Sequence, residues 1–285
     1  MTRPAASPLP RPAGDAVSLR GTTLIVAYRQ ASAERAENLR ATLGFLQRTY
    51  CDFDLVLVEG DASPRFDLHG LRAANLLYHF VEDPGPFNKA RLLNLGARVS
   101  RSPVICFHDA DMIGWPHLMR HAVDVLLDAD ISDVRTPHWS ILNVAGGLKR
   151  RFCRTLDFAV FDSIRTTDLP PDVTRLYDNQ SSGITFWRKD RFVTCGGYHE
   201  GFADWGGEDD ELLIRATRLG LRWHSVPPPT FHLHHDAADR TALHTLAQGD
   251  PAKRALLTLT TGSTPQQLAE HANDLMRRNF GNGTA

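Results

Sequence analysis

The stretch VICFHDAD, residues 104–111, joins a short apolar run to two carboxylates and indicates the fold of the whole chain. Residues 104–107 are apolar and partly β-branched, which is typical of a strand buried inside a sheet. Asp109 and Asp111 follow directly, and side chains two positions apart in an extended backbone point the same way. The sequence therefore predicts a strand that ends in two carboxylates, at the sheet edge where α/β proteins bind ligands.

Upstream of this stretch, strand-like and helix-like patterns alternate. We expect strands at residues 22–27, 54–59, 76–81 and 104–107, and helices at residues 32–48 and 88–99. Strands separated by helical segments predict an α/β fold with a mostly parallel central sheet flanked by helices. In such a sheet the strand ends bring together Tyr28, Arg29, Glu59 and the aspartates after residue 108.

Downstream the pattern is less regular. We expect helices at residues 115–127, 208–218 and 264–278, and strands near residues 131–135 and 184–187. Residues 143–173 show no clear period. Within them, Gly146 and Gly147 precede three basic residues, and this composition predicts a flexible basic loop.

Composition excludes several classes of protein. The 285 residues are 42% hydrophobic and 23% charged, with a formal net charge of −1. That balance gives no electrostatic reason to expect a nucleic-acid partner. No apolar run reaches the roughly 20 residues that a transmembrane helix needs. The four cysteines have no paired spacing, which favours reduced thiols and a cytoplasmic location.

Asp109 and Asp111 form the first of three clusters that could carry chemistry. Their carboxylates suit an oxygen-preferring divalent ion, which can bridge a diphosphate and offset the charge of a leaving phosphate. The alternative is a solvated turn, where aspartate is common.

The second cluster is WGGEDDE, residues 205–211. Trp205 offers a flat apolar face for a sugar, and Gly206 and Gly207 let the backbone approach a ligand closely. The acidic residues 208–211 would repel one another unless a cation or the amides of a helix N-terminus offset their charge. The alternative is an acidic helix start with no further role, and both interpretations can hold together.

The third cluster is HLHHD, residues 232–236, which follows a run of three prolines. Three histidines within four positions favour partial metal binding. His232 and His235 could converge on one ion if the segment turns. A separate zinc site is the competing interpretation, although no cysteine is placed to complete it.

Together these clusters resemble the GT-A glycosyltransferases, a Rossmann-like fold, and within them the β-1,4-galactosyltransferase-like group with its chondroitin-polymerase-like bacterial relatives. Four segments match in order along residues 22–236: AYR at 27–29, FNKARLLNLG at 87–96, FHDAD at 107–111, and the block from Gly183 through GGY at 196–198 to WGGEDD at 205–210.

The resemblance implies roles by position. The residues expected to hold a UDP-sugar are Tyr28, Arg29, Phe87, Lys89, Asp109 and Asp111, to which the strand position adds Glu59. Asp111, His232 and His235 would bind the metal, manganese or alternatively magnesium, with His234 less suited. Asp209 would be the general base, Glu208 and Asp210 its acidic neighbours, and Trp205, Gly206 and Gly207 the acceptor and sugar platform.

The composition and the local patterns, together with the resemblance, predict the domain organisation. We expect a disordered proline-rich tail at residues 1–19 and one GT-A catalytic domain at residues 20–262. Its nucleotide-binding half would span about residues 20–112 and its acceptor and metal half about residues 113–240. A C-terminal helix and tail would occupy residues 263–285.

At two positions the sequence departs from the family pattern, and both departures affect what can be expected of the donor site. Lys89 stands where the family has arginine, so a forked phosphate contact becomes a point charge. The segment QSSG, residues 180–183, replaces an aromatic and glycine-rich segment that helps to select the donor sugar, so the donor is left as a hexose or N-acetylhexosamine.

The expected activity is inverting, metal-dependent transfer of that sugar to a hydroxyl of a carbohydrate such as a growing polysaccharide, a glycolipid, a peptide or a small molecule. Three alternatives stay open: a retaining GT-A transferase, a nucleotidyltransferase that uses the two aspartates, and a non-catalytic carbohydrate-binding module.

Overall fold

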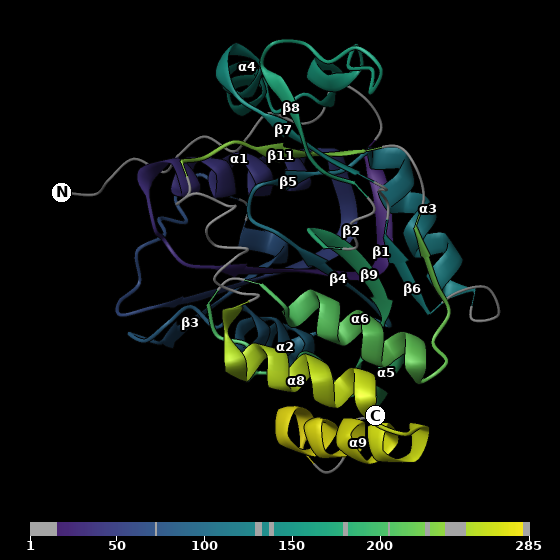
Figure 1. Ribbon diagram of the computed structural model, residues 1–285. Coiled ribbons are helices and arrows are strands. Elements are labelled where there is room, and N and C mark those ends of the chain that lie inside the picture. The colour runs from purple at the N-terminus through teal and green to yellow at the C-terminus, as the bar shows by residue number, and fades with distance from the viewer. Residues whose placement is uncertain are drawn as a thin grey trace.

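The computed structural model describes residues 16–71, 73–128, 133–136, 140–178, 182–204, 206–225, 229–236 and 249–281. These residues form a mixed α/β domain with a seven-stranded sheet and a four-stranded sheet (Figure 1). The strands are β1 (Val17–Tyr28), β2 (Tyr50–Asp61), β3 (Leu76–Glu82), β4 (Val104–His108), β5 (Met112–Ile113), β6 (Val134–Thr136), β7 (Ser140–Val144), β8 (Val173–Asp178), β9 (Ile184–Arg188), β10 (Trp223–Ser225) and β11 (Thr230–Leu233).

The helices lie between these strands and after them. They are α1 (Ala33–Thr49), α2 (Lys89–Val99), α3 (Pro116–Leu127), α4 (Gly146–Thr155), α5 (Lys189–Thr194), α6 (Glu208–Arg218), α8 (Pro251–Gly262) and α9 (Pro265–Phe280), with short 3₁₀ turns η1 (Ala73–Asn75) and η2 (Phe158–Phe161). Ser32 and Asn88 cap α1 and α2 through their side chains, so both helices begin where the sequence predicts.

The large sheet has the order β10-β6-β9-β4-β1-β2-β3. In it β9 runs antiparallel to β4 and β6, and the remaining neighbours are parallel. The predicted, mostly parallel sheet is therefore confirmed. The carboxyl ends of β1, β2 and β4 meet at one edge, which places Tyr28, Glu59 and His108 close together.

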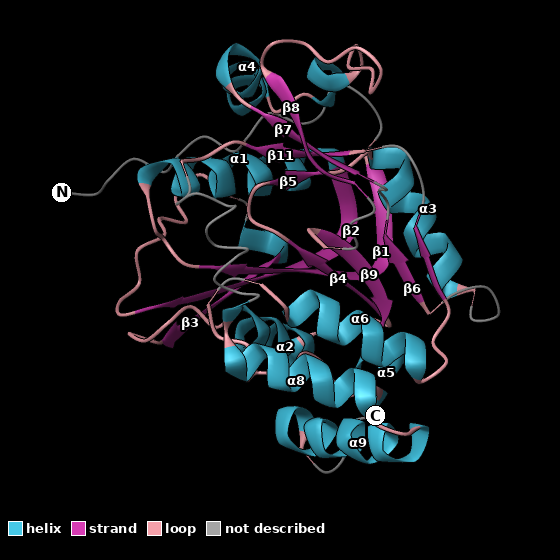
Figure 2. Ribbon diagram, viewed as in Figure 1, coloured by secondary structure: helices cyan, strands magenta, loops and turns pink. Residues whose placement is uncertain are grey.

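Helices cover both faces of this sheet (Figure 2). Alternate side chains of β1 enter two different cores, because successive residues of a strand point to opposite faces. Leu24 and Val26 pack in a core with α1, α3 and the small sheet. Ile25 packs in a second core with residues of α2, α5, α6 and α9. The sheet thus holds the helices that carry the chemistry in fixed positions on either side of its edge.

The small sheet, of order β5-β11-β7-β8, was not predicted. It forms because β11 pairs in parallel with β7 and antiparallel with β5, contacts between segments far apart in the sequence. The predicted flexible basic loop is wrong: Gly146 and Gly147 begin α4, whose Phe152 is fully buried. Lys149 is buried as well, at 7% exposure.

At the chain ends, β1 begins at Val17, so residues 17–19 belong to the sheet and not to a tail, while residues 1–15 lie outside the described residues. α9 begins at Pro265 after the N-cap Thr264, where the sequence predicts a helix; a capping box closes this end, and the helix packs with α5 and α2 (Figure 1). α8, which precedes it, had not been predicted. None of the helices in the described part of the chain is long and apolar enough to cross a membrane.

Candidate active site

Three of the predicted site residues converge as a possible metal site. Asp111 lies just before β5, His232 lies in β11, and His235 follows two residues after that strand. Asp111 Oδ2 is 3.6 Å from His232 Nε2 and 3.2 Å from His235 Nε2. The three ligand atoms all lie within 4.8 Å of one another, and all three residues are buried. One carboxylate and two imidazoles form a donor set that suits manganese or zinc better than magnesium.

The hydrogen-bond partners of the two imidazole rings are also compatible with a bound metal ion. His232 Nδ1 lies 2.9 Å from Asn143 Oδ1, an acceptor, so that nitrogen donates and Nε2 is left with a lone pair. The guanidinium of Arg35 lies 3.3 Å from His235 Nε2, the same nitrogen that faces Asp111 at 3.2 Å. When both imidazoles are neutral with their protons on Nδ1, their Nε2 lone pairs face the carboxylate of Asp111, and a metal ion fits between the three groups.

Asp111 stays ionised in this setting. Burial favours its neutral form, but the charge of His232 and hydrogen bonds from His232 and His235 lower the pKa of the carboxyl well below its usual value. A protonated imidazole or a cation in the same place can supply the positive charge that this anion requires.

Helices α1 and α4 hold the histidine segment in place. Asn38 donates to the backbone oxygen of Leu233 at 2.8 Å, and Lys149 Nζ donates to the oxygen of His234 at 2.6 Å. Glu34 Oε2 accepts from the backbone N–H of Asp236 at 2.8 Å. His234 itself is turned outward, with its side chain 42% exposed and its ring directed at Asn143 and Asp236.

Lys89, the first residue of α2, joins the two acidic clusters. Its Nζ is 2.9 Å from Asp109 Oδ1, 3.4 Å from Asp209 Oδ2 and 3.6 Å from Glu208 Oε1. Burial disfavours the ammonium, but the three carboxylates outweigh it and raise the pKa of Lys89 well above its usual value. One half-buried cation thus bridges motifs that lie about 100 residues apart in the sequence.

Asp209 receives a second contact from Tyr198, whose hydroxyl donates to Oδ1 at 3.0 Å. Glu208 differs from Asp209, since burial and the neighbouring charge of Asp209 raise its pKa to about 7 in spite of Lys89. Its Oε2 is buried and has no hydrogen-bond partner among the described residues. The two adjacent side chains can therefore act differently near neutral pH, one as an anion and the other as a hydrogen-bond donor.

The N-terminus of α6 places these carboxylates. Gly207 caps the helix with φ of 97°, and a Cβ there would meet the Phe202 ring at 2.8 Å. The backbone conformation at position 207 therefore requires glycine. The preceding residue, Gly206, also has a positive φ. Asp210 is exposed, and Glu211 pairs with Arg215 inside the protein and has a structural role. Trp205 lies outside the described residues.

The residues predicted after β1 and β2 line the same edge of the sheet. Arg29 donates to the backbone oxygens of Gly60, Asp83 and Gly85, and its guanidinium lies over the ring of Phe87 at 5.3 Å. Glu59 is fully buried and accepts from Tyr78 and from two backbone N–H groups. Arg29 and Glu59 therefore shape the loops of the site. Tyr28 is also fully buried, and its hydroxyl finds no partner in the described part of the protein.

Four residues with a place in the site escaped the sequence analysis: Arg35, Asn38, Asn143 and Tyr198. Arg35 and Asn38 lie in a helix with ordinary helical spacing, and Asn143 lies in a stretch with no clear period, so none of the three carries a local signal. Tyr198 belongs to the GGY motif, and this motif was the one feature of the sequence that indicated a role for it.

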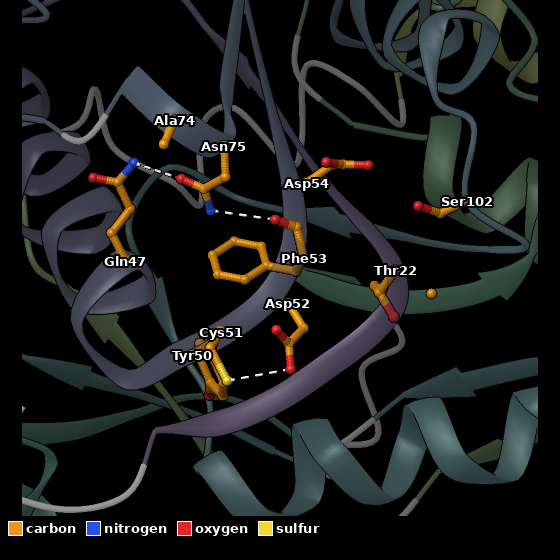
Figure 3. Close-up of a pocket in the computed structure, with 11 residues that line it drawn as sticks. Thr22, Gln47, Tyr50, Cys51, Asp52, Phe53, Asp54, Ala74, Asn75 and Ser102 are labelled. Carbon is orange, nitrogen blue, oxygen red and sulfur yellow. Dashed lines mark hydrogen bonds between the residues drawn. The ribbon is translucent and has the colours of Figure 1, made fainter.

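A separate cavity of about 460 Å³ lies at the opposite edge of the sheet, beside the amino ends of β2, β3 and β4 (Figure 3). Gln47, Asn75, Asp52 and Ser102 are among its lining residues. Gln47 donates to Asn75, and Asn75 donates to the backbone of Phe53. None of the predicted site residues lines this cavity.

Two comparisons with known proteins agree with the geometry. Residues 170–236 match the family described as the N-terminal domain of galactosyltransferase. This segment runs from just before β8 to just beyond β11 and includes both the α6 carboxylates and the histidines. The chain is also similar to validoxylamine A glucosyltransferase of Streptomyces hygroscopicus subsp. jinggangensis (strain 5008), with 28% identity over 221 residues that cover 68% of this chain. Those residues cover 50% of the relative, so the chain spans about half of its length. Together the matches support a glycosyltransferase family for this chain.

Proposed function

We propose that this protein transfers a hexose or N-acetylhexosamine from a UDP-sugar to an acceptor hydroxyl, in a metal-dependent reaction that inverts the anomeric carbon. The observation that carries the proposal is the double cluster at the sheet edge. Asp111, His232 and His235 face one another on one side, and Lys89 ties Asp109 to Asp209 and Glu208 on the other.

In this proposal Asp111, His232 and His235 hold a manganese ion, with magnesium the weaker alternative. A bound divalent ion stabilises the negative charge of a departing diphosphate. Arg35 lies beside the same ligands, 3.3 Å from His235, and supplies a fixed positive charge toward the phosphates. Arg29 and Phe87 form the walls around the uridine, and the fully buried Tyr28 and Glu59 support this edge of the sheet.

Asp209 acts as the general base. Its carboxylate is oriented by Tyr198 and Lys89 and removes the proton from the acceptor hydroxyl as that oxygen attacks the sugar. Glu208, with a pKa near 7 and a free buried oxygen within the described structure, offers a hydrogen bond to a sugar hydroxyl. Asp210, Trp205, Gly206 and Gly207 complete the acceptor side. The four cysteines are free thiols, which supports the proposal of a reducing compartment such as the cytoplasm.

A hydrolysis screen over UDP-sugars with added manganese tests the proposal. We expect slow release of UDP from one donor, dependence on the metal, and product of inverted anomeric configuration by NMR once an acceptor is found. The Asp209→Asn variant should keep donor binding and lose turnover by about 10²- to 10⁴-fold. Full activity of that variant would discard the assignment of the base. Pyrophosphate release from a nucleoside triphosphate would replace it with nucleotidyl transfer, and retained configuration would exclude inversion.

A further inference from the structure

Asn143 stands directly beside the metal-binding histidines. It lies in β7, in the stretch with no clear sequence pattern, and β7 pairs in parallel with β11 so that Asn143 and His232 are backbone partners. Partners in neighbouring strands carry their side chains on the same face of a sheet. The amide of Asn143 therefore reaches the imidazole of His232 without any loop movement.

The amide contacts two histidines with opposite polarity. Asn143 Oδ1 is 2.9 Å from His232 Nδ1, and Asn143 Nδ2 is 3.1 Å from His234 Nδ1. The amide oxygen accepts only and the amide nitrogen donates only. His232 must then carry its proton on Nδ1, while His234 Nδ1 must carry none. The two imidazoles are thereby held in different tautomers by one side chain.

We propose that Asn143 is a positioning residue of the metal site, which directs the Nε2 lone pair of His232 toward Asp111 and holds His234 away from the ion. The inference rests on the proposed function, because it requires that a divalent ion binds between Asp111, His232 and His235. Groups that hydrogen-bond to the far nitrogen of a ligating histidine set its tautomer and typically change metal affinity by about 10- to 100-fold.

The polarity of the amide explains the choice of histidines. His232 and His234 are two positions apart, and their Nδ1 atoms lie against the two ends of one amide. An asparagine with its oxygen toward His232 prepares that residue as a ligand. The amide nitrogen of Asn143 also donates to His234 Nδ1. The other ring nitrogen, His234 Nε2, lies 3.7 Å from Asp236 Oδ1 on the exposed side of the segment.

Manganese titration by calorimetry and by electron paramagnetic resonance tests the proposal, with three variants. Asn143→Leu keeps the branched shape of the side chain and removes both hydrogen bonds, and its manganese affinity should fall about 10- to 100-fold. Asn143→Asp keeps an acceptor beside His232 Nδ1, and its affinity should equal or exceed that of the unaltered protein. Asn75→Leu, in the distant cavity, is the control and should bind manganese as the unaltered protein does.

Long-range ¹H–¹⁵N NMR of the histidine rings supplies a readout that needs neither metal nor substrate. In its neutral form, His232 of the unaltered protein should carry its proton on Nδ1 and none on Nε2, and Asn143→Leu should show a mixture of tautomers. A neutral His232 with its proton on Nε2 and none on Nδ1 in the unaltered protein overturns the proposal even if every variant misfolds. Unchanged manganese affinity in Asn143→Leu overturns it while leaving the proposed function intact. Failure of the unaltered protein to bind manganese overturns both.

Discussion

Lys89 Nζ lies 3.4 Å from Asp209 Oδ2, although 120 positions separate the two residues in the chain. The same ammonium lies 2.9 Å from Asp109, so it joins the acidic strand end to the start of α6. Four charged groups share one small, largely buried volume, and each stabilises or destabilises the charge of the others. Changes to any of them should therefore alter both stability and chemistry.

Replacing Lys89 with methionine should destabilise the protein at neutral pH. Three carboxylates would lose their cation, and removing one partner of a buried ion pair costs several kcal/mol, here about 2–3 kcal/mol because Lys89 is partly exposed. The loss of Tm should be smaller at pH 5 than at pH 8, because Glu208, whose pKa is raised to about 7, binds a proton at the lower pH and then repels its neighbours less. Lys89→Arg, which keeps the charge, is the control. An equal loss of Tm at both pH values would contradict this account.

Replacing Tyr198 with phenylalanine should slow the reaction without weakening donor binding. The variant loses the 3.0 Å hydrogen bond to Asp209 Oδ1 and keeps the aromatic ring in its packing against Phe107. A hydrogen bond to a charged group contributes about 1.5–3 kcal/mol, so kcat should fall at least about 10-fold. Steady-state kinetics with UDP titration check the prediction. A change in donor affinity with unchanged kcat would place Tyr198 elsewhere in the mechanism.

The three histidines should differ in their effect on metal binding. His232→Ala and His235→Ala should each lose most of the manganese affinity, since both Nε2 atoms face Asp111 within 3.6 Å. His234→Ala should retain binding, because this ring is turned outward and partly exposed. Calorimetric titration of the three variants with manganese tests this prediction. Loss of affinity in the His234 variant alone would assign the ion to a different set of ligands.

Replacing Glu208 with glutamine should stabilise the protein at alkaline pH. Burial raises the pKa of this acid from 4.5 to about 7, so the folded state binds a proton that the unfolded state has released. Stability attributable to Glu208 is therefore present below pH 4.5 and declines as pH rises toward 7. Glutamine mimics the protonated acid and should not show this decline.

The measurement is the difference in Tm between Glu208→Gln and the unaltered protein, recorded from pH 4.5 to pH 8. This difference should grow in favour of the variant across that window. Asp210→Asn, at an exposed position of the same helix turn, is a suitable control. A difference that is constant with pH would show that the carboxyl of Glu208 titrates normally.

Replacing Arg35 with glutamine should have opposite effects on two ligands. The guanidinium lies 3.3 Å from His235 Nε2 and lowers the pKa of Asp111 through its charge. Without it, manganese alone should bind more tightly, because a neighbouring positive charge is gone. UDP in the presence of manganese should bind more weakly, because a cation beside the diphosphate is lost. Effects of the same sign on both ligands would exclude this arrangement.

The first half of the fold was predictable because its signals are local. The helices that begin after Ser32 and Asn88, and the strands that end at Tyr28, Asp61 and His108, follow from apolar period and capping residues within about 15 positions. The strand-end rule then placed these residues at one edge. The structure of residues 140–178 was not predicted, because β7 and β8 are short and α4 begins with two glycines.

The sequence by itself determined which chemical groups are present, which strand or helix end carries each of them, and that a mostly parallel sheet would support them. Only the tertiary structure decided that Lys89 bridges two acidic motifs, that Asn143 contacts two histidines and Arg35 a third, and that Lys149 is buried beneath the histidine segment. The physical reason is the separation along the chain over which each interaction acts. Period and capping act between neighbours along the chain, whereas the pairing of β7 with β11 and the packing of α1 against residues 233–236 depend on contacts across about 90 to 200 positions.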